Sequence, residues 1–396
     1  VLHPNARFVL MSRRAVLMGT VVGVMMALAV PVTALDLPGE MLPDGDTRPV
    51  IVSAELHAPR SGDALLETSI SIEAEDNDGI LHYEYRWRGT VPGNINETSV
   101  DDPTISYFSV LPDTEYRLEV RAVDLNGWES EWYPAWEGRT PSPPMIVLAG
   151  DSIASGYTRQ WFTSDATCRD ADLSFGRTVR TAVAAALPPA WSPGYSNIAF
   201  PGAGVNTVLN GGSDSCSESH PSQIEDVERV TDPTTWNVVV VTAGINSTNW
   251  VDVVKELTKD TAFSFTKSGD RAACEVAMTE HWNLDGKRND ITAATSEIVE
   301  ALDARTNASV FWASYFAIDG STIAPGWAPI GPECADEMAD ALGALHGAIQ
   351  AGLNEAVTWN DIADLDVTTQ MWAAWPHPNR PRHESIGLEV ASALTG

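Results

Sequence analysis

The sequence is short of basic residues, and this shortage excludes several classes of protein. Its 396 residues include 24 Lys and Arg against 54 Asp and Glu, for a formal net charge of −30. Binding to a phosphate backbone or to an anionic membrane needs a basic face, so the composition argues against a nucleic-acid partner. With 44% hydrophobic and 20% charged residues, a wholly disordered chain and a polytopic membrane protein are also excluded.

Signatures of metal and nucleotide chemistry are missing as well. The chain has no HExxH pattern, no Walker A loop and no GxSxG elbow, so zincin, phosphate-loop and ordinary α/β-hydrolase interpretations lose their main support. None of the cysteines forms a CxxC pair, which favours two disulfides over a zinc site. We therefore expect no metal and no organic cofactor. All four cysteines lie in the second half of the chain: Cys168, Cys216, Cys274 and Cys334.

The first 34 residues have the features of an export signal. Arg13 and Arg14 precede the uncharged stretch 15–34, which ends in small residues typical of a cleavage site. We expect residues 1–34 to be a signal peptide with an upstream extension, and the protein to be secreted. An uncleaved membrane anchor is the alternative, and the twin-arginine and general export routes are both open.

An all-β module is expected next. Residues 35–49 are rich in Pro, Gly and Asp, as in a linker, and residues 50–140 show the alternation of β-strands. Tyr116 precedes a strand at a corner, and this pattern resembles the fibronectin type III family, whose sandwich carries a corner tyrosine. Two further strands, joined by the turn 76–79, have these inward residues: Leu66, Thr68, Ile70, Ile72 and Ala74 on one, and Leu81, Tyr83, Tyr85 and Trp87 on the other.

The aromatic end of this module has two interpretations. Trp128, Trp132, Tyr133 and Trp136 crowd together in the sequence. A polysaccharide or surface ligand is one option, and packing in the core or between domains is the favoured one.

A second domain is expected over residues 145–396, after the proline-rich break 141–144. Short apolar runs alternate there with helical segments, which predicts a parallel sheet covered on both faces, in a three-layer α/β/α, flavodoxin-like arrangement. The predicted strands are 145–149, 195–200, 238–242 and 310–315, and the predicted helices are 173–187, 290–306 and 334–357.

Three of these strands run into residues suited to nucleophilic catalysis. The first is followed by Gly150-Asp151-Ser152, the second by Pro201-Gly202-Ala203-Gly204, and the third by Ala243-Gly244-Ile245-Asn246. Ligands of open α/β sheets gather at the carboxyl ends of the strands, so a hydroxyl, a glycine-rich turn and an amide would meet at one edge. His377, in a late loop, can supply the base that a serine nucleophile needs.

The order of these blocks resembles the SGNH (GDSL-type) hydrolase family over residues 145–396. The position of Gln223 and of the cysteines is similar to its secreted actinobacterial esterase branch. This resemblance implies a carboxylic ester hydrolase in which Ser152 is the nucleophile and His377 the general base. It further implies an oxyanion hole made by the N–H groups of Ser152 and Gly202 and the amide of Asn246.

The implied substrate is an ester of a small acyl group, a lipid or an acetylated carbohydrate. No long apolar lid segment is evident, which favours an esterase or deacetylase over a true lipase. An adhesion or carbohydrate-binding protein with a vestigial hydrolase domain is the alternative from another class.

Three positions depart from the family's pattern. Ser247 follows Asn246 where the family usually has Asp, and Arg382 replaces a Gly of the last block. Ala374 stands where the family usually has the Asp that orients the histidine. We expect the backbone carbonyl of Ala374 to orient His377 instead, with Asp366 as the second choice.

Four cysteines permit three pairings, and the sequence alone does not choose among them. The resemblance to the secreted branch implies Cys168 with Cys216 and Cys274 with Cys334.

Overall fold

The structure is a computed structural model of the chain. It describes residues 47–57, 69–89, 95–101, 105, 109–157, 174–215, 218–232, 237–258, 271–306, 308–313, 315, 332–356, 360–362 and 380–395. The expected signal peptide and most of the expected linker lie outside these ranges. Within them, no helix combines the length and the apolar character that a membrane span requires.

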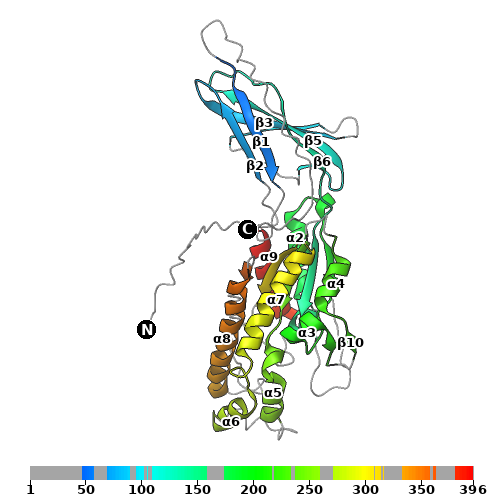
Figure 1. The fold of residues 1–396 in the computed structure, drawn as a ribbon, viewed down its shortest axis with the longest axis vertical. Helices are drawn as coiled ribbons and strands as arrows, with labels where there is room; N and C mark the ends of the chain where they lie inside the picture. The colour runs from blue at the N-terminus through cyan, green and yellow to red at the C-terminus, as the bar shows by residue number, and fades with distance from the viewer. Residues whose placement is uncertain are drawn as a thin grey trace. The chain divides into compact units, whose positions relative to one another are not determined.

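The N-terminal part consists of antiparallel strands (Figure 1). Alternate side chains of these strands are buried, and Trp87, Leu118 and Val120 are fully so. The predicted turn is present, because the Asp76 carboxylate accepts the N–H groups of Asp78 at 2.8 Å and Gly79 at 3.0 Å. One sheet pairs β1 (Val50–His57) with β2 (Ser69–Glu75), and the other has the order β4 (Ile95–Val100), β3 (Ile80–Gly89), β5 (Glu115–Asp124), β6 (Tyr133–Arg139).

The inward position predicted for Leu81 is wrong, since this side chain is 50% exposed. The pairing of β3 with β5 shifts register between Ile80 and His82. A bulge of this kind inserts one residue into the alternation and turns that residue to the other face. From Tyr85 onward the predicted face is the buried one. Leu66 and Thr68, predicted for the preceding strand, lie outside the described residues.

The aromatic residues of this part are engaged within it. The Tyr116 hydroxyl accepts the Leu111 N–H at 3.3 Å, as a corner tyrosine does. Trp87 meets the rings of Tyr116 and Trp136 edge to face, at centroid distances of 6.0 and 5.8 Å. The guanidinium groups of Arg86 and Arg121 lie 3.9 and 4.6 Å from the ring centre of Trp132. These contacts favour the packing interpretation of the aromatic cluster.

The second part is built on a parallel sheet, as predicted. Every residue of two adjacent interior strands, β11 (Asn237–Thr242) and β12 (Ala308–Ala313), is buried, which is expected when helices cover both faces. The strand order is β13 (Asn360–Ile362), β12 (Ala308–Ala313), β11 (Asn237–Thr242), β7 (Met145–Gly150), β8 (Gly194–Asn197).

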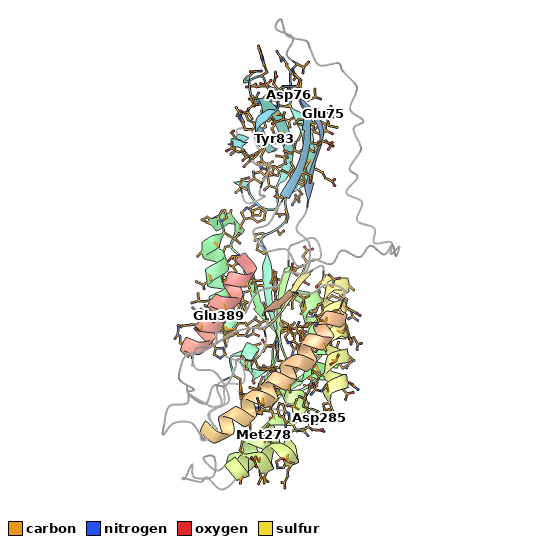
Figure 2. All side chains as sticks on the ribbon, turned by 90° about the vertical axis from the view of Figure 1, so that its left-hand side faces the viewer. Glu75, Asp76, Tyr83, Met278, Asp285 and Glu389 are labelled. Atoms are coloured by element: carbon orange, nitrogen blue, oxygen red, sulfur yellow. The ribbon has the colours of Figure 1, made fainter. Side chains whose placement is uncertain are left out.

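Helices lie on both sides of this sheet. Figure 2 shows α9 (Arg380–Thr395) and α2 (Phe175–Ala186) on one side and α7 (Arg288–Thr306) and α8 (Pro332–Glu355) on the other. The predicted helices correspond to α2, α7 and α8, with ends within a few residues. The described chain also contains α1 (Ser152–Ser155), α3 (Val205–Asn210), α4 (Gln223–Val230), α5 (Trp250–Thr258), α6 (Arg271–His281) and the short hairpin β9 (Gly212–Ser213) and β10 (Ser219–His220).

Local sequence explains how α2 is placed. Ser174 precedes it, and its hydroxyl accepts the Gly176 N–H at 3.3 Å, which caps the first turn. Phe175, Val179 and Val183 recur at four-residue spacing and are all fully buried, so one stripe faces the sheet. On the outer side, Gly387 of α9 approaches so closely that a Cβ there would lie 2.6 Å from the Phe175 carbonyl oxygen.

Candidate active site

The three predicted blocks follow three adjacent strands. β7 lies between β8 and β11, and all three run parallel, so the loops after them meet at one edge of the sheet. Ser152, Gly202 and Asn246 in these loops are each partly exposed, while Asp151, Ala203 and Ala243 beside them are buried. The sheet therefore brings the predicted nucleophile and the predicted oxyanion-hole residues to the same edge, with access to solvent.

Each loop turns at a glycine with a positive φ angle. The values are 122° at Gly150, 89° at Gly202 and 137° at Gly244. At Gly150 a Cβ would lie 1.9 Å from the Thr242 carbonyl oxygen, so no other residue fits without moving the neighbouring strand. The glycine pattern of the sequence thus reflects the close approach of β7 to β11.

Asp151 places Ser152 at the start of α1. The Asp151 N–H donates to the Thr242 carbonyl at 2.8 Å, and its carboxylate accepts the Ile153 N–H at 2.9 Å as the helix N-cap. As the first helical residue, Ser152 has an N–H with no acceptor inside the helix. This is the N–H that the sequence analysis assigned to the oxyanion hole.

Gln223, the first residue of α4, clamps Gly150 from the other side. Its side chain is fully buried. The Gln223 Oε1 accepts the Gly150 N–H at 2.6 Å, and Nε2 donates to the Gly150 carbonyl at 2.8 Å. The sequence showed Gln223 only as part of a family resemblance, because a partner 73 residues away leaves no local signal.

Two residues join the second and third loops. The Asn246 Nδ2 donates to the Ala203 carbonyl at 3.1 Å, which orients the amide and leaves the other hydrogen of this nitrogen for a ligand. The Ser247 hydroxyl accepts the Val205 N–H at 3.1 Å. Gly204, the N-cap of α3, has no side chain for this purpose, so Ser247 supplies the cap from the neighbouring loop. The departure at Ser247 therefore has a structural role.

Asn197 and Ser174 fix the far end of α1. The Asn197 Nδ2 and the Ser174 hydroxyl both donate to the Ala154 carbonyl, at 3.0 and 2.7 Å. The Asn197 Oδ1 also accepts the Ala199 N–H at 3.1 Å, which ties α1 to the loop after β8.

Tyr315, two residues beyond β12, bonds to the loop after β7 and to the loop after β11. Its hydroxyl donates to the Asp151 Oδ2 and accepts the Ile245 N–H at 3.0 Å. In the sequence, Tyr315 stands out only as the end of the predicted strand 310–315. A buried aspartate beside the nucleophile needs a hydrogen-bond donor, and a search for that donor could have pointed to Tyr315.

Burial determines the protonation of this pair. It raises the pKa of Asp151 to about 7, against the lowering effect of the hydrogen bonds from Tyr315, Ile153 and Ala154. Burial, followed by the charge of Asp151 and the hydrogen bond to it, raises the pKa of Tyr315 well above 10. The phenol therefore remains a donor over the whole working range of an enzyme.

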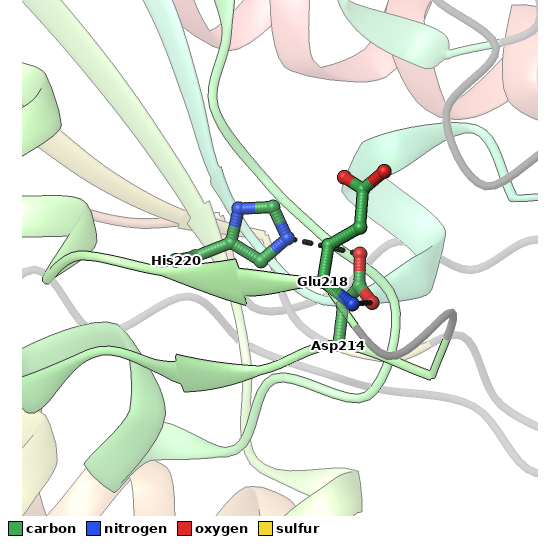
Figure 3. A group of neighbouring side chains, drawn as sticks. All are labelled: Asp214, Glu218 and His220. Carbon is green, nitrogen blue, oxygen red and sulfur yellow. Dashed lines mark hydrogen bonds and ion pairs between the residues drawn. The ribbon is translucent and has the colours of Figure 1, made fainter.

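A second cluster lies on the β9–β10 hairpin (Figure 3). The His220 Nε2 lies 2.9 Å from the Asp214 Oδ2, and the Asp214 Oδ1 accepts the Glu218 N–H at 2.8 Å. The ligand atoms of these three residues lie within 4.8 Å of one another, as a divalent cation requires. Binding would require His220 to release Asp214, so we assign the cluster a structural role.

This hairpin supports the loop that carries Gly202. The His220 ring stacks on Phe200 at a centroid distance of 4.3 Å, and the Ser215 N–H donates to the Pro201 carbonyl at 2.9 Å. A Cβ at Gly202 would lie 2.6 Å from the Ser215 Oγ. The hairpin and the predicted oxyanion loop thus pack as one unit.

Several predicted site residues lie outside the described residues: His377, Ala374, Asp366, Cys168 and Cys216. Cys274 of α6 is fully buried and disulfide-bonded, while the side chain of Cys334 is not described, so both pairings stay predictions. His383 of α9 is 2% exposed, neither of its nitrogens has a hydrogen-bond partner within the described part of the chain, and burial lowers its pKa to about 4. It is therefore a neutral packing residue.

Comparison with known proteins finds similarity only among solved structures. No family model and no curated protein matches the sequence. Phospholipase A1 from Streptomyces albidoflavus NA297 is 15% identical with a TM-score of 0.41, covering 64% of this chain and 100% of that one. An active-site mutant of a family two carbohydrate esterase from Clostridium thermocellum is 13% identical with a TM-score of 0.35, covering 87% and 97%. A carbohydrate acetylesterase from Sinorhizobium meliloti is 10% identical with a TM-score of 0.33, covering 63% and 97%. At these values the similarity assigns neither a family nor an activity.

Proposed function

We propose that the protein is a secreted serine esterase of the SGNH type, acting through Ser152 and His377. The observation that carries the proposal is the meeting of Ser152, Gly202 and Asn246 at one sheet edge, after three adjacent parallel strands. Buried and partly buried hydrogen bonds hold all three loops, as an enzyme needs for groups that must stay in place while charge develops.

The mechanism uses this arrangement in two steps. His377 takes the proton of the Ser152 hydroxyl as the oxygen attacks the ester carbonyl carbon, and the carbonyl oxygen becomes an alkoxide. The N–H groups of Ser152 and Gly202 and the Asn246 amide donate to that alkoxide. When the C–O bond breaks, His377 returns the proton to the leaving alcohol. Water then hydrolyses the acyl-enzyme by the same route, which regenerates Ser152.

The orientation of His377 is part of the proposal. Ala374 presents a backbone carbonyl three residues before the histidine, and we propose that this oxygen accepts the imidazole N–H, with Asp366 as the second choice. The finer features follow the sequence: a signal peptide over residues 1–34, a fibronectin type III-like module over residues 50–140, and disulfides Cys168–Cys216 and Cys274–Cys334. The substrate is an ester of a small acyl group, a lipid or an acetylated carbohydrate.

The test is turnover of short p-nitrophenyl esters by the wild-type protein and by Ser152→Ala. We expect Ser152→Ala to lose nearly all activity, because nucleophile and base act as one unit. Ser192→Ala, which removes an exposed hydroxyl after a short 3-10 helix, is the matched control and should retain wild-type turnover. A fluorophosphonate should label the wild type and leave Ser152→Ala unlabelled. Equal turnover in Ser152→Ala and wild type would exclude the mechanism, and an inactive, unlabelled wild type would support the adhesion or carbohydrate-binding alternative.

A further inference from the structure

We propose that Tyr315 is a positioning residue that holds the loop of Ser152 and the loop of Asn246 in a fixed relation. The proposal rests on the proposed function for its catalytic consequence. Its structural core is independent of that function: one phenol oxygen bonds to Asp151 and to Ile245. These residues immediately precede Ser152 and Asn246 in the sequence.

The sheet order explains why Tyr315 can do this. Tyr315 follows β12, which neighbours β11, and β11 neighbours β7. A side chain long enough to cross the end of β11 reaches the loop after β7. In this position its hydroxyl also lies beside the backbone of the loop after β11, where it accepts the Ile245 N–H. Tyr315 therefore links the ends of three consecutive strands through a single atom.

The two bonds are directional, and this makes the link specific for a phenol. The hydroxyl donates its one hydrogen to the Asp151 Oδ2 and uses a lone pair for the Ile245 N–H. The other Asp151 oxygen accepts the Ile153 N–H, so the carboxylate is held at both ends. Neither the position of α1 nor that of the third loop can change without breaking a buried hydrogen bond.

Tyr315 contacts no reacting atom in this arrangement. Its effect on the reaction acts through the distance between the Ser152 oxygen and the donors that receive the alkoxide. Small errors in that distance weaken transition-state stabilisation more than substrate binding. We therefore expect the loss of the hydroxyl to appear in kcat and to leave KM nearly unchanged.

The experiment removes one oxygen, by Tyr315→Phe. We expect kcat to fall by about 10- to 100-fold, with KM within about twofold of wild type and with slower fluorophosphonate labelling of Ser152. In a double-mutant cycle, Asp151→Ala combined with Tyr315→Phe should cost little more than the worse single variant, because both substitutions break the same bond. Tyr116→Phe, which loses the hydroxyl bond to Leu111 in the N-terminal part, is the matched control and should keep wild-type kcat.

Amide hydrogen exchange supplies a readout that does not depend on activity. In Tyr315→Phe the Ile245 amide should exchange faster than in wild type, and in Tyr116→Phe it should not. If Tyr315→Phe does not fold, Asp151→Ala alone should show the same fall in kcat at constant KM and the same faster exchange. Wild-type kcat in Tyr315→Phe together with unchanged Ile245 exchange would overturn the proposal, and so would a rise in KM at constant kcat. An inactive wild type with faster Ile245 exchange in Tyr315→Phe would refute the esterase function and leave the positioning contact standing.

Discussion

The two parts of the described chain use polar side chains in opposite ways. On the β3–β5 face of the N-terminal part, charged residues pair with one another: Arg86 with Glu119 at 2.7 Å, and Arg121 with Glu84 and Glu129. At the sheet edge of the second part, uncharged amides and hydroxyls bond to the backbone, as Gln223 does with Gly150. The ion pairs of Arg121 are partly exposed, so salt screens them, whereas a buried amide on a backbone group fixes one geometry. The comparison indicates that side-chain positions are fixed most tightly at the strand ends of the second part.

The largest effect is expected at Gln223, whose fully buried side chain makes two hydrogen bonds to the backbone of Gly150. Gln223→Ala leaves the Gly150 N–H without this partner, whereas the Gly150 carbonyl keeps the Phe200 N–H at 3.2 Å. An unsatisfied buried group costs about 1–3 kcal/mol and the second lost hydrogen bond about 1 kcal/mol, so we expect the unfolding free energy to fall by up to about 4 kcal/mol in urea titration, with loss of esterase turnover.

Gln223→Glu is the matched variant for this prediction, because it keeps the shape and the acceptor and can donate to the Gly150 carbonyl only while its carboxyl is protonated. It should be more stable than Gln223→Ala at a pH where the new carboxyl is protonated, and it should lose stability as the pH rises and the carboxyl ionises. Wild-type stability in Gln223→Ala would remove the distinction between the two parts.

His383 provides the next largest effect, as a buried polar side chain without a partner. Its pKa is about 4 in the folded protein, below the ordinary value of 6.5, so the unfolded chain binds more protons between these two values. The stabilising contribution of neutral His383 is therefore complete above about pH 6.5 and is lost as pH falls towards 4. The shift corresponds to about 3 kcal/mol.

His383→Phe should remove this acid sensitivity and be neutral or stabilising at pH 7, since no hydrogen bond is lost. Urea titration at several pH values measures the slope. Ser192→Ala, which changes an exposed hydroxyl and no titratable group, serves as control and should keep the wild-type slope between pH 4 and 6.5. A wild-type slope in His383→Phe would show that another group causes the acid sensitivity.

The smallest effect is expected among the ion pairs. Arg121→Gln breaks the pairs with Glu84 and Glu129 and weakens the contact with Trp132. Such pairs typically contribute under about 1 kcal/mol, and 0.5 M salt should reduce the difference from wild type further. Thermal unfolding at low and high salt measures both quantities. A salt-independent loss of several kcal/mol would contradict this and show that Arg121 contributes as much as a buried contact at the sheet edge.

Much of the candidate site could be predicted because its signals are local. An apolar run that stops at glycine predicts where a strand ends, and Ser152, Gly202 and Asn246 follow such runs directly. The residues that hold these loops were missed because their partners are distant: Tyr315 is 164 residues from Asp151. The error at Leu81 has a different origin, since a bulge arises from the pairing between two strands and cannot be seen in the sequence alternation of either one.

The positive-φ glycines also bear on how the protein can be engineered. At Gly150 a new Cβ would meet a backbone carbonyl, whereas at Gly202 and Gly244 its nearest neighbours are the side chains of Ser215 and Ile349, at 2.6 and 3.0 Å. A compensating change at Ser215 or Ile349 can therefore make room at these two positions, and the backbone strain of the positive φ then remains, which is largest at Gly244, where φ is 137°. Libraries for new specificity should leave Gly150 constant and vary the other two glycines only together with the side chain that faces each of them.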